Sequence, residues 1–168
     1  MGDCYTWLRE MANTPQDWMR QAIDLAIQNV RAQGGGPFGA LVVKDGKLVA
    51  SGVNSVTASN DPTAHAEVNA IRSACRELAT YQLSGCELYT SCEPCPMCLG
   101  AIYWARPERF YYACGREDAR ACGFDDAFIY DELDRSPEER TIRGQRLLRD
   151  EGLAAFEEWK RSPNKVRY

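Results

Sequence analysis

The sequence predicts a layered α/β fold, because segments typical of strands and of helices alternate along the chain. Strand composition occurs at residues 40–43, 47–50, 86–90 and 109–113, and apolar residues at helical spacing occupy the stretches around them. The 168 residues are 45% hydrophobic, which is enough to bury the core of one domain. No internal repeat, low-complexity segment or linker interrupts the pattern. We therefore expect a single domain over residues 14–168.

The first helix is expected to begin directly after Thr14. Threonine is a good N-cap, Pro15 suits the first helical position, and Asp17 is an early acid. Apolar residues then recur at helical spacing as far as Val30, and three glycines end the helix. For residues 1–13 we favour a loose N-terminal extension, with a short docking helix as the open alternative.

The remaining elements follow from turn residues and periodicity. Asp45 and Gly46 lie between the first two strand segments and are typical of a β-hairpin turn. Cys92 is expected in the loop that joins the third strand to the next helix. The later helices are expected at residues 64–78, 96–105, 116–122 and 150–160.

Charge and cysteine content narrow the classes of function. The chain has 20 basic and 24 acidic residues and a pI near 5.1, so it lacks the electrostatic footprint of a protein that binds a phosphate backbone. A small-molecule substrate is therefore favoured over nucleic acid. No apolar run approaches the roughly 20 residues of a membrane-spanning helix. Eight cysteines in a chain that opens without a basic, apolar signal sequence lead us to expect a reducing, cytoplasmic location.

The strongest chemical signal is a pair of motifs, His65-Ala66-Glu67 and Pro94-Cys95-Pro96-Met97-Cys98. Together they form the H-x-E and P-C-x-x-C signature of zinc deaminases. One imidazole and two thiolates leave a fourth tetrahedral position for water, whose pKa a zinc ion lowers to about 7. Glu67 is then placed to carry protons without being a ligand. Both motifs lie at expected helix starts, where the helix dipole also favours thiolates.

These motifs are compatible with two other interpretations. Cys92, Cys95 and Cys98 are spaced by three, so a closed Cys₃His site with four protein ligands is sterically conceivable. Glu67 argues against it, since a carboxylate beside a closed site would have no chemical task. The other reading is a zinc-stapled interaction domain without catalysis, which replacement of Glu67 by glutamine would distinguish from an enzyme.

Three further residues are candidates for a substrate pocket, each with an ordinary structural role as the alternative. Phe38 follows a glycine-rich stretch and either stacks on a heterocyclic ring or belongs to the core. Asn54 follows the second strand and either offers a donor and an acceptor to a base edge or serves as a turn residue. Asp126 follows Gly123 and either accepts a hydrogen from a leaving amine or lies solvated in a turn.

These motifs resemble the cytidine deaminase superfamily, and more closely the small bacterial guanine deaminases with this fold. The similarity runs from about residue 15 to the C-terminus, and its most specific segments are residues 35–40, 60–68, 89–107 and 123–130. The resemblance implies a three-layer α/β/α fold around a five-stranded mixed sheet. It also implies hydrolysis of guanine at C2 to xanthine and ammonia, with one zinc ion per subunit.

The same resemblance assigns roles to individual residues. The zinc ligands would be His65, Cys95 and Cys98. Glu67 would carry a proton from the zinc-bound water to the purine ring nitrogen and then help to protonate the leaving amine. The implied substrate contacts are stacking by Phe38, hydrogen bonds from Asn54 and the Ala66 backbone, contact of Asp126 with the C2 amine, and a pocket wall formed by Trp104.

The resemblance further implies a homodimer whose C-terminal segments are exchanged, so that a terminal tyrosine reaches the partner's active site. This chain ends in Tyr168, which is therefore expected to contact substrate. Residues 139–150 depart from the family pattern, because Gly144 and several arginines obscure the strand before the last helix. The path of the exchanged segment is therefore left open.

Other substrates are compatible with the same zinc and carboxylate. Guanosine, cytosine or another aminated ring would use the same chemistry, and tRNA adenosine deaminases carry the same signature. A tRNA substrate would favour a basic C-terminal helix, but residues 150–161 carry four acidic and two basic side chains. The expected function is guanine deamination, with the other rings as alternatives.

Overall fold

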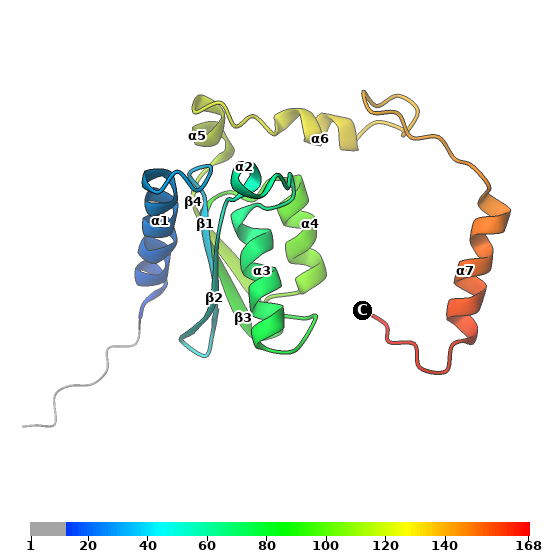
Figure 1. Cartoon of the computed structure of the whole chain (residues 1–168), viewed down its shortest axis with the longest axis horizontal. Coiled ribbons are helices and arrows are strands. Elements are labelled where there is room, and N and C mark those ends of the chain that lie inside the picture. The colour runs from blue at the N-terminus through cyan, green and yellow to red at the C-terminus, as the bar shows by residue number, and fades with distance from the viewer. Residues whose placement is uncertain (1–12) are drawn as a thin grey trace, which may run out of the picture. The chain divides into compact units, whose positions relative to one another are not determined.

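The computed structural model describes residues 13–168 (Figure 1). Residues 1–12, and with them almost all of the expected N-terminal extension, lie outside the described residues. The chain divides into two compact units, one that ends at Asp125 and one that spans Asp126–Tyr168. The expectation of a single domain over residues 14–168 stays a prediction. Within residues 13–168, no helix is long and apolar enough to cross a membrane.

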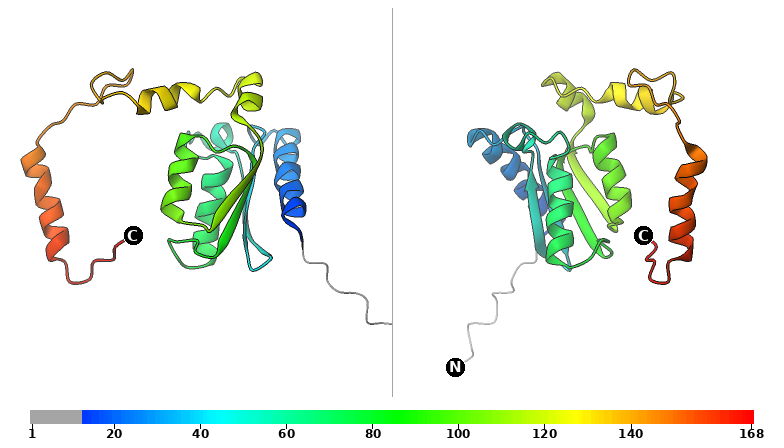
Figure 2. Two further views of the ribbon diagram at one scale, coloured as in Figure 1. Left: turned by 180° about the vertical axis from the view of Figure 1, so that it is seen from behind. Right: turned by 45° about the vertical axis from the view of Figure 1, so that its right-hand side comes forward.

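The first unit contains a mixed sheet covered by helices. Its elements are α1 (Pro15–Arg31), β1 (Gly39–Lys44), β2 (Lys47–Val53), α2 (Val56–Ser59), α3 (Ala66–Glu77), β3 (Cys86–Cys92), α4 (Pro96–Ala105), β4 (Arg109–Cys114) and α5 (Arg116–Ala121). The strand order is β2-β1-β3-β4; β1 is antiparallel to both neighbours, and β3 is parallel to β4. α1 lies on one face of the sheet, and α3 and α4 lie on the other (Figures 1 and 2). The three layers of the expected α/β/α fold are therefore present.

The two faces of the sheet build two apolar cores. On β1, Ala40 and Val42 belong to the core shared with α3 and α4, whereas Leu41 and Val43 pack with Trp18 of α1. This alternation is the two-residue period of a strand. Because β1 is covered on both faces, four apolar residues follow one another in the sequence instead of alternating with polar ones.

The expected fifth strand is wrong for the described residues, because the sheet has four strands. After β4 the backbone enters α5, and residues 142–148 pair with no strand. A strand requires a neighbour for its backbone N–H and C=O groups. Here local bonds take their place: the Gly144 N–H donates to the Pro137 carbonyl at 2.8 Å, and the Thr141 N–H donates to the Glu132 carboxylate at 2.6 Å.

The local signals at the start of the chain are confirmed. Thr14 caps α1 through a capping box with Asp17. Asp45 and Gly46 both have positive φ, 49° and 69°, as a tight type I′ hairpin turn requires. Two short helices, α2 and α6 (Ala127–Leu133), were not predicted. Each is less than two full turns long, so neither contains enough residues to show a helical period.

The second unit contains α6 and α7 (Arg149–Arg161), of which α7 confirms the helix expected at residues 150–160. Neither helix has a buried residue. Phe128 is 62% exposed and Phe156 is 64% exposed. Large apolar side chains that are exposed together commonly mark a surface that associates with another chain.

Replacing Leu88 with alanine is expected to lower the free energy of unfolding by about 2–5 kcal/mol. Leu88 is fully buried in β3, in the core beneath α3 and α4, so the shorter side chain leaves a cavity. Urea denaturation measures the change. The same substitution at Leu48, which is 48% exposed on β2, should cost less than about 0.5 kcal/mol. Equal losses at the two positions would contradict this assignment of the core.

Candidate metal centre and substrate pocket

Two helix starts bring the predicted zinc ligands together. His65 is the N-cap of α3, Cys95 is the N-cap of α4, and Cys98 lies in the first turn of α4. His65 Nδ1 lies 3.5 Å from each of the two sulfur atoms, and the three ligand atoms all lie within 4.8 Å of one another. The sequence places these residues about thirty positions apart, and packing of both helices on the same face of the sheet makes them neighbours.

The spacing of these atoms fits a zinc ion. With Zn–N of about 2.0 Å and Zn–S of about 2.3 Å, tetrahedral geometry separates an imidazole nitrogen from a thiolate sulfur by roughly 3.5 Å. Nδ1 of His65 is the nitrogen that faces both sulfur atoms, so a neutral ring that ligates there carries its proton on Nε2. The donor set leaves the fourth tetrahedral position to a non-protein ligand.

The two thiols of the ligand group differ in their pKa, and therefore in how readily each forms the thiolate that binds a metal. A hydrogen bond from Cys98 lowers the pKa of Cys95 to about 4. The same hydrogen bond, together with burial, holds the pKa of Cys98 far above its usual range. The hydrogen bond between the two sulfur atoms therefore favours the thiolate at Cys95 and keeps the proton on Cys98. A bound cation would displace that proton, since zinc binds thiolates.

Glu67 lies beside this group in the first turn of α3 and is only 6% exposed. Burial raises the pKa of its carboxyl above the usual range, because the charged form is poorly solvated there. Its neighbours include both thiols. A carboxyl group that can both hold and release a proton next to an activated water is what a hydrolytic reaction requires of a general acid and base.

Cys92 does not belong to the metal group. The structure corrects its expected place in a loop: it is the last residue of β3, paired with Cys114 of β4. Its thiol donates to the Gly115 carbonyl at 3.6 Å, and burial raises its pKa to about 11. The group found among residues 13–168 contains His65, Cys95 and Cys98 only, which argues against the closed four-ligand site.

The glycine-rich loop before Phe38 passes close to Asn54. Gly35 has φ of 152°, and a Cβ atom there would lie 2.3 Å from the Asn54 carbonyl oxygen. Any other residue would therefore separate the loop from Asn54. Phe38 packs edge-to-face on Phe124, with ring centroids 5.0 Å apart, and borders the core that α3 covers. Phe38 thus lies at the border between core and pocket.

Asn54 is buried and its side chain is oriented by the backbone. Its Oδ1 atom accepts from the Gly36 N–H at 3.2 Å and from the Val56 N–H at 3.4 Å. Its Nδ2 group donates to no other group within residues 13–168, so it is available as a donor. The alternative of a simple turn residue explains the oxygen, but not the free amide hydrogens.

Two asparagines at this site were not predicted from the sequence, the buried Asn29 and the half-buried Asn69. Asn29 of α1 donates through Nδ2 to the Gly36 carbonyl at 2.9 Å and to the Asn54 carbonyl at 2.8 Å. Asn69 of α3 donates to the Val53 carbonyl at 2.9 Å. The available signal was a polar residue in the apolar stripe of each helix, since Asn29 continues the buried series Trp18, Ala22 and Ala26.

The four remaining residues predicted to contact substrate differ in their position and exposure. Ala66 is the first residue of α3, where backbone N–H groups have no partner within the helix. Trp104 of α4 is 64% exposed. Asp126 is the N-cap of α6, and Tyr168 is 69% exposed at the end of the chain. Asp126 and Tyr168 both belong to the second unit, and the roles of all four residues stay predictions.

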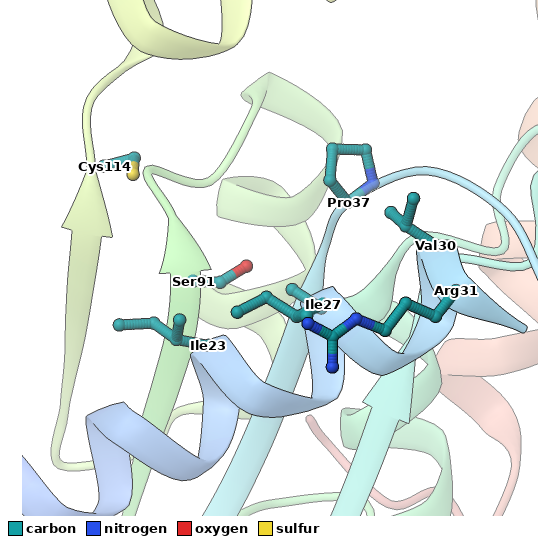
Figure 3. A pocket seen from close by; sticks show the side chains of 8 residues that line it. Ile23, Ile27, Val30, Arg31, Pro37, Ser91 and Cys114 are labelled. Atoms are coloured by element: carbon teal, nitrogen blue, oxygen red, sulfur yellow. The ribbon is translucent and has the colours of Figure 1, made fainter.

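An apolar cavity of about 420 Å³ lies elsewhere in the first unit (Figure 3). Its walls come from the second half of α1 and from the ends of β3 and β4, with Ile27, Arg31 and Cys114 among them. It includes none of the residues predicted to bind metal or substrate. The metal centre is therefore identified by its side chains and not by this cavity.

Comparison with known proteins supports the metal centre. Residues 12–114 match the model of the cytidine and deoxycytidylate deaminase zinc-binding region, and this range includes both metal motifs. The chain belongs to the cytidine and deoxycytidylate deaminase family. Membership of this zinc-binding family and the three-ligand group together identify zinc as the cofactor.

Within the deaminase family, the relatives differ in how much of the chain they match. A guanine deaminase from Bacillus subtilis is 56% identical over 153 residues, which cover 91% of this chain and 98% of the relative. The X-ray structure of guanine deaminase from Bacillus subtilis has a TM-score of 0.91 and 54% identity, covering 93% of this chain and 99% of that one. A tRNA-specific adenosine deaminase from Aquifex aeolicus is 48% identical, but over 46% of this chain and 51% of the relative. The predicted resemblance to guanine deaminases is confirmed.

Proposed function

We propose that this protein catalyses the zinc-dependent hydrolysis of guanine at C2, in which water is consumed and xanthine and ammonia are released. The observation that carries the proposal is the three-ligand group of His65, Cys95 and Cys98 with buried Glu67 beside it. The similarity to a guanine deaminase over 91% of the chain supports guanine as the ring. The tRNA-specific relative matches less than half of the chain.

Proton transfer is assigned to Glu67. Zinc, when bound, supplies water activated for attack near neutral pH. The Glu67 carboxylate takes the proton that this water loses and delivers it to the ring nitrogen adjacent to C2. It then takes the remaining proton of the new C2 hydroxyl group and passes it to the amine, so that the C2–N bond breaks, the C2 carbonyl forms and ammonia leaves. Its burial supports this role, because a raised pKa lets the carboxyl group hold the proton between the two transfers.

Purine binding is assigned to residues from several elements. The free Nδ2 group of Asn54 and the Ala66 N–H at the start of α3 donate to acceptors on the base edge. Phe38 stacks on the ring. Asp126 contacts the C2 amine, and Trp104 closes one wall of the pocket.

The decisive test is ammonia release by the purified, zinc-loaded protein from guanine, guanosine, cytosine and adenine. Xanthine formed from guanine alone would establish the proposed function. Turnover of another ring and not of guanine would support the zinc-dependent deamination mechanism but would exclude guanine as the substrate. If the protein binds zinc but releases ammonia from none of the four compounds, the alternative of a non-catalytic interaction domain stabilised by zinc is favoured.

We also propose that the protein is a cytoplasmic homodimer with exchanged C-terminal segments. The second unit supports association, because apolar side chains such as Leu148, Phe156 and Val166 are exposed there. Zinc-binding thiols require reduced cysteines, which supports the cytoplasm. Sedimentation equilibrium of the full chain tests the dimer, and a monomer at all concentrations would contradict it. Fractionation of source cells tests the location.

Deletion of residues 165–168 is expected to lower guanine turnover by about tenfold or more while leaving folding almost unchanged. Tyr168 is proposed to contact substrate in the partner's site, and it is 69% exposed, so its loss removes little packing. Steady-state kinetics and thermal unfolding measure the two effects. Val166→Ala serves as the control that keeps the terminal tyrosine. Full activity of the shortened protein would exclude a role for Tyr168.

A further inference from the structure

We propose that Asn29 is a positioning residue for the substrate pocket, which sets the glycine loop and Asn54 relative to each other. The proposal rests on the proposed function, since it takes Asn54 and Phe38 to bind the purine. Asn29 lies on α1, which contributes no metal ligand. Its two hydrogen-bond acceptors are the carbonyls of Gly36 and Asn54, which lie on the proposed substrate side of the site.

The Asn29 side chain and the two carbonyl groups that it bonds, those of Gly36 and Asn54, form a clamp between two loops. Asn29 is only 7% exposed, and both hydrogens of its amide are used: one donates to the Gly36 carbonyl at 2.9 Å and the other to the Asn54 carbonyl at 2.8 Å. Gly36 in turn donates through its N–H to the Asn54 side chain at 3.2 Å. One side chain from α1 thus joins the two backbone segments that carry the stacking ring and the base-edge amide.

The clamp determines where the Asn54 side chain points. The Asn54 carbonyl is buried, and Asn29 is the donor that satisfies it. Without that donor, the peptide group after Asn54 is held only through its Ser55 N–H, which donates to the Ala64 carbonyl at 3.0 Å. It can then tilt about this one hydrogen bond, and the Asn54 side chain tilts with it. The Gly36 carbonyl also accepts from the Phe38 N–H at 2.8 Å, so a shift at Gly36 reaches the phenyl ring directly.

Gly34 is coupled to this clamp by close contact. A Cβ atom on Gly34 would lie 2.4 Å from Oδ1 of Asn29, which is too close for both to keep their places. Gly34 does not have a positive φ, so alanine there meets the Asn29 side chain without backbone strain. Because two hydrogen bonds hold the Asn29 amide, Gly34→Ala is expected to displace the clamp as replacement of Asn29 does.

Asn29→Asp is the variant of choice, because it keeps the shape of the side chain and removes both donors. We expect KM for guanine to rise about tenfold or more, kcat to change less than about threefold, and zinc to stay at one ion per chain. Gln28→Glu makes the matched amide-to-carboxylate change on the exposed side of α1 and should leave KM unchanged. A purely structural role would reduce kcat or zinc content without a selective rise in KM.

A double-mutant cycle makes the coupling measurable. Gly34→Ala alone should raise KM as Asn29→Ala does, whereas the double variant should be no worse than Asn29→Ala alone, since the contact no longer exists. Fully additive effects on KM would overturn the clamp, as would an unchanged KM in Asn29→Asp. If Asn29→Asp fails to fold, the comparison of Gly34→Ala with the double variant decides the matter by the same criterion.

The wild-type assay separates this proposal from the proposed function. A wild-type protein that binds zinc but leaves guanine intact overturns guanine as the substrate, and KM is then measured for the ring that it does convert. A wild-type protein that converts guanine, with normal KM in Asn29→Asp, overturns the positioning role alone.

Discussion

Replacing Glu67 with glutamine is expected to leave zinc bound and to lower guanine turnover by about two to four orders of magnitude. Glutamine keeps the size of the side chain and one oxygen acceptor, but it cannot take a proton from water and return it to the ring. The proposed metal ligands are His65, Cys95 and Cys98, and Glu67 is not among them, so zinc occupancy should not change. Zinc analysis and ammonia release by the same preparation measure the two properties.

The control for this substitution is Glu77→Gln, at the exposed end of the same helix. It removes the same charge from α3 at a distance from the metal group and should leave turnover within about twofold. Near-normal turnover by Glu67→Gln would exclude Glu67 as the proton carrier. Loss of zinc from Glu67→Gln would instead give the carboxylate a part in holding the metal, contrary to the three-ligand assignment.

Cys98→Ser is expected to abolish zinc binding and guanine turnover together. The Cys98 sulfur lies 3.5 Å from His65 Nδ1 and is fully buried in the first turn of α4. Serine is close in size, but its hydroxyl does not ionise as a thiol does, so only two of the three protein ligands remain effective. Metal analysis after dialysis should find almost no zinc, and restoring zinc to the buffer should not restore activity.

Cys92→Ser is the matched control for the closed-site alternative. Cys92 is also buried and lies six residues earlier, but it donates to the Gly115 carbonyl and lies outside the ligand group. A serine hydroxyl can make the same hydrogen bond. Zinc content and turnover should therefore stay close to those of the wild type. If Cys92→Ser loses as much zinc as Cys98→Ser, the result would support the closed site with four protein ligands.

Much of the first unit could be predicted because its signals are local. Thr14 and Asp17 cap a helix within one turn, and Asp45 with Gly46 determines a two-residue turn. The helix from Pro96 to Ala105 was predicted to the residue, since proline marks its start and Arg106-Pro107 its end. Interactions within four or five residues are enough to determine such elements.

The errors share a physical cause. Cys92 was expected in a loop because Pro94 follows it, yet pairing with Cys114 of the neighbouring strand extends β3 to that residue. A fifth strand was expected from resemblance, but residues 142–148 find no strand beside them. In each case the backbone conformation depends on whether a neighbouring strand, distant in the sequence, pairs with the segment. The periodicity of a segment describes that segment alone and does not reveal its partner strand.

The sequence by itself determined the metal chemistry of this protein. One histidine, a neighbouring glutamate and a Cys-x-x-Cys pair at two helix starts predict the ligands and the proton carrier, because helix starts and the spacing within each motif are local properties. Only the tertiary structure decided that Cys92 stands apart from the metal and that Asn29 joins Gly36 to Asn54. These residues become neighbours only when α1 packs against the sheet. The apolar pattern of the sequence predicts that these faces pack, but it does not predict which buried polar groups then pair with each other.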